Sequence, residues 1–411
     1  MPLSIRIRLS IVMFFQSAIN ASVYPILSLY LSAYLHFSGS EAGLVMSMTA
    51  LAAFVSPLVG AFIADRLVRA ERLYSLFLLV ASLVMLVLSF ERSFASVLLV
   101  YLAFALVYGP TNALAIAIVF HHAPDAKRGF GGIRVWGTIG WIGVAWIFGF
   151  LWLRAEGGGQ VIGRLPDSLR LASIVSLLVG LFAFSLPTRT APTRSTRPSF
   201  LPVESLRIVR RPAVALFLLF CLLEQSMDSY YYFGTSLFLR HLGYAPGLIL
   251  PLMSLGQMTE IFTMLILGRL LARLPFRALF AAGASAELLR FLIFFSGTPP
   301  ALVVVGLTLH GIAYASFFGS AYIYLDLQST PTARAGVQQL FAIATGGFGA
   351  LVGNLLAGRM LDLTTRAGGA TDWREFWAVP VVIAVLVVTG LVTLFREAPP
   401  RPVEVAPAHG G

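Results

Sequence analysis

The sequence predicts an all-α membrane protein with twelve transmembrane helices in two six-helix repeats. Three observations lead to this expectation: long apolar runs follow one another along the chain, arginines gather in alternate connections, and short segments of the first half recur in the second. Of the 411 residues, 58% are apolar and only 11% are charged. A soluble chain of this length needs more charge on its surface, so the composition favours a membrane protein.

The apolar runs are long enough to be membrane helices. Runs of 18 residues or more can cross a hydrocarbon core of roughly 30 Å. Backbone polar groups in lipid must be satisfied internally, so such runs are helical, and the period-2 alternation of a membrane barrel does not occur. The predicted spans are 9–35, 41–63, 73–90, 94–119, 130–153, 169–186, 212–239, 243–270, 278–295, 299–325, 334–361 and 373–395.

The distribution of basic residues predicts the orientation. Of 29 Lys and Arg, 19 lie on the side of the amino terminus, seven lie on the other side, and three are inside or at the edge of spans. Short cytoplasmic loops carry the excess of Lys and Arg. We therefore expect a multi-pass protein of the cytoplasmic (inner) membrane with both termini in the cytoplasm. Because the bases are scattered over short loops, the net charge of +11 does not indicate nucleic-acid binding.

An internal repeat divides the chain. Residues 45–48 (Val-Met-Ser-Met) match residues 252–255 (Leu-Met-Ser-Leu) at an offset of 207, and the glycine stripe of the fifth span recurs in the eleventh. We predict an N-terminal half over 1–186, a cytoplasmic linker without a packed core over 187–211, and a C-terminal half with a short tail over 212–411. Two such halves, related by an axis along the membrane normal, describe the major facilitator fold.

The fifth span carries a polar face. Arg134, Thr138 and Trp141 follow i, i+4, i+7 spacing, so they share one side of the helix. A guanidinium, a hydroxyl and an indole there suit a polar ligand that contains a ring, because the indole can stack on the ring and the arginine can bond to oxygens. The alternative is that Arg134 extends to the cytoplasmic surface.

Acids and amides inside other spans are further candidates. Gln257 and Glu260 lie one turn apart in the eighth span, and a carboxyl group at membrane depth normally faces the bundle interior or a water-filled cavity. Glu260 is thus a candidate for proton or substrate binding, or else a structural acid paired with a base such as Arg134. The seventh span offers Glu224, Gln225, Asp228, Tyr231 and Tyr232, and the first offers Gln16 and Asn20 as ligand contacts or interhelical hydrogen bonds.

Several motifs in this order resemble the nucleoside:proton symporter family of the major facilitator superfamily, from about residue 39 to 395. They are Gly-Ile-Arg-Val-Trp-Gly-Thr-Ile-Gly-Trp at 132–141, Ser-Leu-Gly-Gln-Met-Thr-Glu at 254–260, Leu-Leu-Arg-Phe at 288–291, Arg-Ala-Gly-Val-Gln at 334–338, Gly-Gly-Phe-Gly at 346–349 and Thr-Asp-Trp at 371–373. The resemblance implies proton-coupled import of a nucleoside-like solute by alternating access. Symport of a sugar or an aromatic acid is an alternative, as is a membrane sensor that does not transport.

The resemblance also implies roles for individual residues. Asp65 and Arg66 end a Gly-x4-Asp-Arg segment similar to the facilitator signature, which implies a cytoplasmic gate; an ordinary charge pair near the membrane surface is the other interpretation. The tenth span keeps the family's aromatic residue as Tyr314, but Ala315 stands where the best-known members carry an acid. The proton is then expected on Glu260, which matches a family position, or on Asp228.

Other chemistry is not expected. Glu287 and Arg290 are one turn apart and neutralise each other as a structural pair. His121 and His122 have no companion ligands, so we expect no metal, and without a phosphate-binding Gly-Lys-Ser/Thr loop we expect no nucleotide cofactor and no enzyme activity. The expected partners are a small solute, protons and the lipid bilayer, and the protein is expected to be a monomer.

Overall fold

Long apolar helices make up nearly all of the computed structural model, which describes residues 3–59, 69–122, 126–153, 161–187, 203–330 and 333–397. Eleven helices in these ranges are long and apolar enough to cross a membrane. The second predicted span is described as far as Val59, as α3 (Gly39–Val59). The prediction of an all-α chain of membrane-spanning helices is confirmed.

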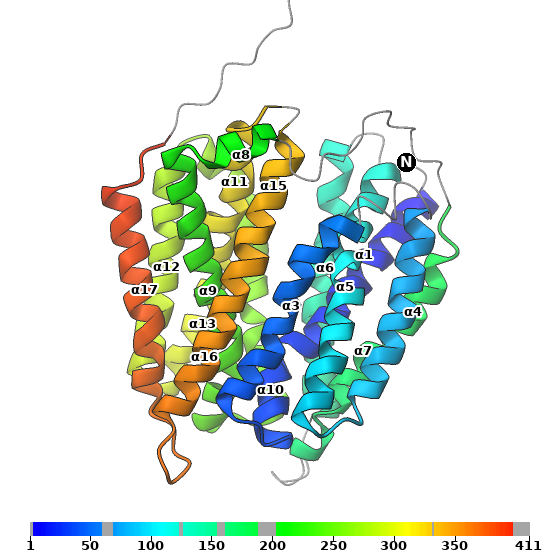
Figure 1. Ribbon diagram of the computed structural model, residues 1–411, viewed down its shortest axis with the longest axis vertical. Helices are drawn as coiled ribbons and strands as arrows, with labels where there is room; N and C mark the ends of the chain where they lie inside the picture. The colour runs from blue at the N-terminus through cyan, green and yellow to red at the C-terminus, as the bar shows by residue number, and fades with distance from the viewer. Residues whose placement is uncertain are drawn as a thin grey trace, which may run out of the picture.

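The first half of the chain forms one bundle (Figure 1). Several spans combine more than one helical segment, because short 3-10 or π turns interrupt the α-helix. The segments are α1 (Leu3–Val23), η1 (Tyr24–Ile26), α2 (Leu27–Leu29), η2 (Tyr30–Tyr34), α3, α4 (Ala70–Leu88), α5 (Phe94–His122), α6 (Ala126–Ile147), η4 (Phe148–Trp152), η5 (Ile162–Arg164) and α7 (Asp167–Ala183).

The second half forms a bundle beside the first (Figure 1). Its segments are α9 (Pro212–His241), α10 (Pro246–Met253), α11 (Leu255–Leu271), α12 (Phe276–Ser296), α13 (Pro300–Tyr314), η6 (Ala315–Gly319), α14 (Ser320–Leu327), α15 (Arg334–Ala342), η7 (Ile343–Gly349), α16 (Ala350–Thr364) and α17 (Trp373–Thr393). Asp372 caps α17 by accepting hydrogen bonds from the N–H groups of Arg374 and Glu375.

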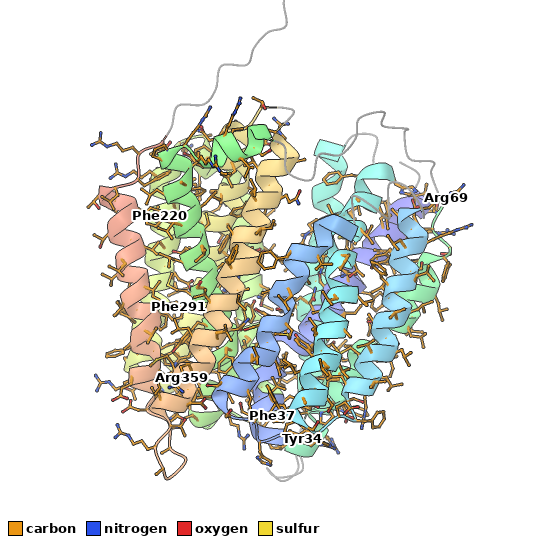
Figure 2. The ribbon with its side chains drawn as sticks, in the orientation of Figure 1. Tyr34, Phe37, Arg69, Phe220, Phe291 and Arg359 are labelled. Atoms are coloured by element: carbon orange, nitrogen blue, oxygen red, sulfur yellow. The ribbon has the colours of Figure 1, made fainter. Side chains whose placement is uncertain are left out.

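The start of α1 and the end of α17 lie at the same end of the bundles, which distinguishes that end from the other (Figure 1). We call the end where α1 begins and α17 ends the termini face, and the other end the opposite face. Figure 2 shows Arg69 at the termini face and Tyr34 and Phe37 at the opposite face. Helices alternate between the two directions, as a polytopic membrane protein requires.

The glycine stripes make equivalent contacts in the two halves. A Cβ added to Gly137 would lie 2.8 Å from the Ser17 hydroxyl of α1, and one added to Gly349 would lie 2.8 Å from Cβ of Gln225 in α9. The fifth span therefore packs on the first as the eleventh packs on the seventh. This correspondence is what a repeat of six helices predicts, and small residues permit the close approach.

Glycines also meet between the halves, at the opposite face. Gly149 of η4 contacts Gly247 of α10: a Cβ on Gly247 would lie 2.8 Å from the Gly149 carbonyl oxygen. Gly39 of α3 and Gly358 of α16 are similarly in backbone contact. Each member of one pair corresponds in the repeat to a member of the other, so the halves touch through two related contacts.

Hydrogen bonds between the halves lie near the same face. The Asp362 carboxylate of α16 accepts the N–H groups of Gly39 at 2.6 Å and Ser40 at 2.8 Å. These are unpaired donors at the start of α3, where the helix dipole favours an anion. The Trp146 indole donates to the Ser254 hydroxyl at 3.0 Å, and the hydroxyls of Ser28 and Ser236 are 2.9 Å apart.

The described end of the linker is helical, which differs from the expectation of an unpacked segment. α8 (Val203–Val209) packs against the C-terminal half: Ile208 is buried, and the Ser205 hydroxyl donates to the Ala333 carbonyl at 3.1 Å. The apolar residues among the arginines supply the buried side of this short helix. The Pro, Ser and Thr content of the linker as a whole did not predict it.

Candidate functional site

A cavity of about 440 Å³ lies between the two halves. Its size is in the range of small-molecule sites, which occupy about 300–1,000 Å³. All eight residues that the sequence predicted to bind solute line it: Arg134, Thr138, Trp141, Gln225, Asp228, Gln257, Glu260 and Tyr314. The structure thus brings together residues from both halves of the chain that helix spacing and the family resemblance had predicted one helix at a time.

The N-terminal wall is built on α6. Arg134, Thr138 and Trp141 line the cavity together, as expected for residues on one helix face. The close packing of Gly137 on Ser17 brings this face of α6 alongside α1. α1 itself adds Asn20 to the lining.

Aromatic rings from both halves meet at the cavity. The Trp141 indole lies 6.5 Å from the Tyr232 ring of α9, centroid to centroid, and Tyr232 is 4.8 Å from the Tyr24 ring of η1. Both distances are within the range of favourable aromatic pairs. A planar ring in the cavity would find π surfaces on either side of the interface between the halves.

The C-terminal wall carries the amides and acids. The Gln225 amide donates to the Asp228 carboxylate at 3.3 Å, and the Gln257 amide donates to the Tyr232 hydroxyl at 3.1 Å. Tyr314 ends α13 just before the π-helical turn η6, and Ala315 is fully buried. A hydrogen-bonding wall thus faces the stacking wall of α6.

The charges of the cavity are divided between the halves. Arg134 is the cation on the N-terminal wall, and Asp228 and Glu260 are the carboxyl groups on the C-terminal wall. Within the described ranges Arg134 and Glu260 form no ion pair, although the charge of Arg134 acts on Glu260 across the cavity. The sequence left open a structural pairing of these two residues, and in this structure neither is locked to the other.

Glu287 and Arg290 form the expected ion pair, deep in the C-terminal half. Arg290 also donates from Nη1 to Nδ1 of His310 at 2.8 Å, and that nitrogen is 3.5 Å from the Asp228 carboxylate. Arg290 therefore does more than neutralise Glu287. It extends the pair to a residue that lines the cavity.

The other predicted residues have varied positions. Gln16 is buried and makes interhelical hydrogen bonds with Thr111, Asn112 and Tyr74, so it takes the structural alternative, whereas Asn20 faces the cavity. Asp65 and Arg66 lie outside the described residues. Among the described residues no group of three or more His, Cys, Asp or Glu could hold a metal ion.

Sequence reasoning missed part of the lining. Asn112 and Tyr108 of α5 line the cavity, and so does His310. A polar stretch, Gly-Pro-Thr-Asn at 109–112, interrupts the apolar run of the fourth span, and His310 is a lone histidine in the tenth. Polar groups at membrane depth normally face the bundle interior, so both signals could have added these residues to the candidates.

The chain is similar to several known proteins. A family model described as nucleoside H⁺ symporter matches residues 3–399. The putative nucleoside transporter YegT of Escherichia coli (strain K12) is 30% identical over 95% of this chain and 94% of its own length. The xanthosine permease of the same organism is 28% identical over 92% of each chain.

Solved structures share the fold. The crystal structure of the nucleoside transporter NupG has a TM-score of 0.83 at 23% identity, covering 96% of this chain and 100% of that chain. The D-xylose-proton symporter has a TM-score of 0.72 at 10% identity, covering 96% of this chain and 98% of that chain. The predicted major facilitator fold is confirmed by these likenesses.

Proposed function

Because the chain belongs to the nucleoside H⁺ symporter family, we propose that it imports a nucleoside-like solute together with protons, by alternating access of its two halves. One observation carries the proposal beyond family membership. Stacking, amide and carboxyl groups from both halves converge on a single cavity. A solute bound there touches both halves, so it can be released on either side as the halves move.

The two walls divide the recognition of a nucleoside. Trp141 supplies a stacking surface for the base, and Arg134 and Thr138 beside it donate hydrogen bonds to base or ribose oxygens. The amides of Gln225 and Gln257 can both donate and accept, which suits the edge of a base or the ribose hydroxyls. Each of these groups lines the cavity.

Glu260 is the leading proton-coupling residue in this proposal. It lines the cavity and has no ion-pair partner within the described ranges, so a proton can reach it from cavity water and neutralise it. Asp228 is the second candidate, and it differs because His310 is already 3.5 Å away. A carboxyl group that cycles between charged and neutral needs this kind of access.

The contacts between the halves support the proposal that one side of the cavity is closed in this structure. We propose that the termini face is cytoplasmic and that the opposite face, where Asp362 binds the start of α3, is the sealed external side. Transport then requires those hydrogen bonds and glycine contacts to separate. We propose Asp65 and Arg66 as the gate at the cytoplasmic side, where they control the rate of exchange without contacting solute.

Uptake by proteoliposomes tests the function. Radiolabelled adenosine, uridine and xanthosine are offered under an inward proton gradient, with unlabelled sugars and aromatic acids as competitors. We expect gradient-dependent accumulation of at least one nucleoside that other nucleosides inhibit. Competition only by a sugar or an aromatic acid would reassign the solute, and binding without transport would favour a sensor.

Glu260→Gln tests the coupling residue. If Glu260 must gain and lose a proton in each cycle, the variant loses accumulation driven by the gradient but retains exchange of labelled for unlabelled nucleoside, since exchange need not release the proton. Glu91→Gln, outside the cavity between α4 and α5, is the matched control and should behave as the wild type. Uphill accumulation by Glu260→Gln at the wild-type level would move the coupling to Asp228.

A further inference from the structure

A group of charged residues is buried beside the cavity in the C-terminal half. We call it the buried cluster; its members are Glu224 and Asp228 of α9, Glu287 and Arg290 of α12, and His310 of α13. Arg290 is 0% exposed, and Glu224, Glu287 and His310 are each 3% exposed. Lipid-facing or surface roles are thereby excluded for these four residues, and only Asp228 and His310 also line the cavity.

The contacts form a chain from the interior to the cavity. Arg290 is paired with Glu287 and donates to His310 Nδ1 at 2.8 Å, and Nδ1 lies 3.5 Å from the Asp228 carboxylate. Two ring contacts fix this geometry. The Tyr231 ring stacks on His310 at 5.2 Å with an interplanar angle of 14°, and the Arg290 guanidinium lies 3.9 Å from the centroid of the same Tyr231 ring.

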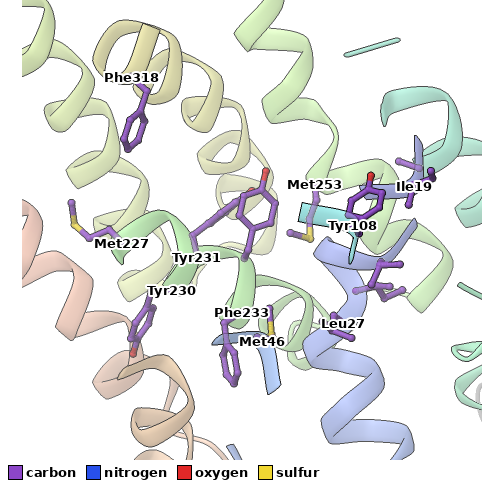
Figure 3. Close-up of a cluster of buried hydrophobic side chains, with 14 of the residues drawn as sticks. Ile19, Leu27, Met46, Tyr108, Met227, Tyr230, Tyr231, Phe233, Met253 and Phe318 are labelled. Carbon is purple, nitrogen blue, oxygen red and sulfur yellow. The ribbon is translucent and has the colours of Figure 1, made fainter. Parts of the chain in front are cut away.

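Figure 3 shows how α9 permits this arrangement, because Tyr230 and Tyr231 leave the helix on different sides. The Tyr230 hydroxyl donates to the Phe376 carbonyl of α17 at 2.7 Å, which anchors α9 on the far side from the cluster. Tyr231 is thereby directed towards His310 and Arg290. The chain of contacts thus lies between packed helices and not on a mobile segment.

His310 Nδ1 is shared by two neighbours with opposite requirements. A guanidinium can only donate, so Nδ1 must accept when it bonds to Arg290. A charged Asp228 carboxylate also needs a donor, which Nδ1 cannot then supply. A protonated Asp228 needs no donor and can direct its hydrogen to the same Nδ1 lone pair only as a weak bifurcated contact, which fits the 3.5 Å separation. A charged Asp228 is satisfied when Nδ1 carries the hydrogen and Arg290 turns to Glu287 alone.

The count of charges leads to the same conclusion. The buried cluster contains three carboxyl groups and one guanidinium, and Arg290 already neutralises Glu287. The Oε1 atom of Glu224 has no hydrogen-bond partner within the described part of the chain. Neither Glu224 nor Asp228 has a cation of its own in the described part of the chain. A charged Glu224 buried in this way costs several kcal/mol, and a charged Asp228, which is 13% exposed and accepts a hydrogen bond from Gln225, costs less, so a proton on each is the simplest compensation.

We propose that the buried cluster holds an exchangeable proton, that Asp228 exchanges it with the cavity, and that His310 couples the charge of Asp228 to Arg290. In the step, the Asp228 O–H bond breaks and its proton passes to cavity water. On His310 the Nε2–H bond breaks and an Nδ1–H bond forms, with cavity water taking the first proton and supplying the second, so the ring stays neutral. The Nδ1–H group then donates a hydrogen bond to the Asp228 carboxylate. Nε2 accepts from the Tyr232 hydroxyl, 3.4 Å away, in place of donating to it. Asp228 is the proton-binding residue, and His310, Arg290 and Glu287 are positioning residues.

Other groups face the cluster and are part of its electrostatics. By packed element, they are Cys221, Gln225, Tyr231 and Tyr232 on α9, Gln257 and Glu260 on α11, Tyr314 on α13, and Tyr24 on η1 of the N-terminal half. The Gln257 amide donates to the Tyr232 hydroxyl, which in turn contacts His310 Nε2. A change of tautomer at His310 therefore alters a hydrogen bond that extends to the cavity wall on α11. The proposal rests on the proposed function of proton-coupled transport. It makes Asp228 a second proton-binding residue in addition to Glu260.

Infrared difference spectroscopy tests the cluster without requiring transport. The purified protein is titrated from about pH 4 to pH 10, a range that brackets buried carboxyl groups, and the C=O band of a protonated carboxyl group is assigned to Asp228 by its loss in Asp228→Asn. We expect such a band with a measurable midpoint. Adenosine addition should then change the band if solute and proton bind together.

Two variants should move the midpoint in opposite directions. His310→Phe removes the donor to charged Asp228 while keeping a ring against Tyr231, so the midpoint should rise, by about one unit or more. Glu287→Gln removes an acid and frees Arg290 to act on His310 and Asp228, so the midpoint should fall. His122→Phe replaces a buried histidine of the N-terminal half that bonds only to backbone carbonyls, and it should change nothing.

The outcomes separate this proposal from the proposed function. Absence of an Asp228 band across the titration, or an unchanged midpoint in both variants, overturns the cluster even if nucleoside uptake is observed. A midpoint that moves as expected supports the cluster even if uptake fails. If one variant does not fold, the sign of the shift in the other still decides.

Discussion

Replacing Gly247 by alanine tests how the two halves are held together at the opposite face. A Cβ at this position would lie 2.7 Å from the Leu153 carbonyl oxygen and 2.8 Å from the Gly149 carbonyl oxygen. Ordinary contact begins at about 3.4 Å, so α10 and η4 must separate by about 0.6–0.7 Å. Both obstructing atoms belong to the backbone, so no side chain can rotate away to relieve the clash.

The cost falls on one state of the transporter only. Overpacking of this kind typically costs about 1–3 kcal/mol. In a state with the halves apart at the opposite face, the added methyl group meets nothing and costs nothing. The equilibrium should therefore shift towards that state by about 5- to 150-fold, while the affinity for solute within each state stays the same.

Distances between spin labels measure the shift. Labels at Ser38→Cys and Ala367→Cys both lie at the opposite face, one on each half, so their distance reports how far the halves are apart there. Cys221, the single native cysteine, is replaced by alanine in this background. We expect Gly247→Ala to enlarge the population with the longer distance. Gly268→Ala is the control, since its Cβ would have nothing within 4 Å, and it reproduces the general helix-stabilising effect of alanine.

A distance distribution that is identical in Gly247→Ala, Gly268→Ala and the parent protein would refute the reasoning. It would mean that the glycine contact is not specific to the state described here. A fall in solute affinity without any change in distances would place the effect of Gly247 in binding instead.

Four further predictions follow from other parts of the structure. Trp141→Ala should weaken nucleoside binding by about 1–3 kcal/mol through loss of a stacking surface, and an unchanged Kd by calorimetry would remove Trp141 from the site. Asp362→Ala, which leaves the N–H groups at the start of α3 without their acceptor, should speed labelling of a thiol at Ser28→Cys, a buried position that contacts Ser236 of the other half; equal labelling rates would contradict the seal. Hydrogen bonds from the Glu375 N–H and the Arg366 side chain lower the pKa of Asp372 below 3.8, so its stabilisation of the start of α17 is complete above that pH and is lost as pH falls through the lowered pKa. Asp372→Ala should thus reduce Tm at neutral pH more than Asp372→Asn, which still caps the helix, and equal Tm values would argue against the cap. A reporter active only in the cytoplasm, fused after Gly411, should give a signal; silence from a well-expressed fusion would reverse the topology.

Local spacing, together with the family resemblance, predicted much of the fold and the cavity. Helix periodicity selects residues on one face, and the cost of polar groups in lipid directs that face inwards, which is why Arg134, Thr138 and Trp141 line one cavity together. The ion pair of Glu287 and Arg290 was also predictable, since both residues lie on one helix a single turn apart.

Contacts that join different helices could not be predicted in this way. His310 meets Arg290 and Asp228 only because α9, α12 and α13 pack in one particular register, which no spacing within a helix records. The meeting of Gly149 with Gly247 likewise depends on how the halves are placed. The short η turns inside spans were also missed, because a slightly tighter 3-10 turn or a slightly wider π turn leaves no clear trace in an apolar sequence.

The division of the cavity between the halves has a consequence for how such proteins diversify. The indole and the guanidinium come from residues before the linker, whereas both cavity carboxyl groups and the whole buried cluster come from residues after it. A chimaera could therefore combine the first half of this chain with the second half of a relative, provided that the glycine contacts of α3 and η4 are kept. In such a chimaera, the stacking surface of the cavity and its carboxyl groups would each come from a different parent.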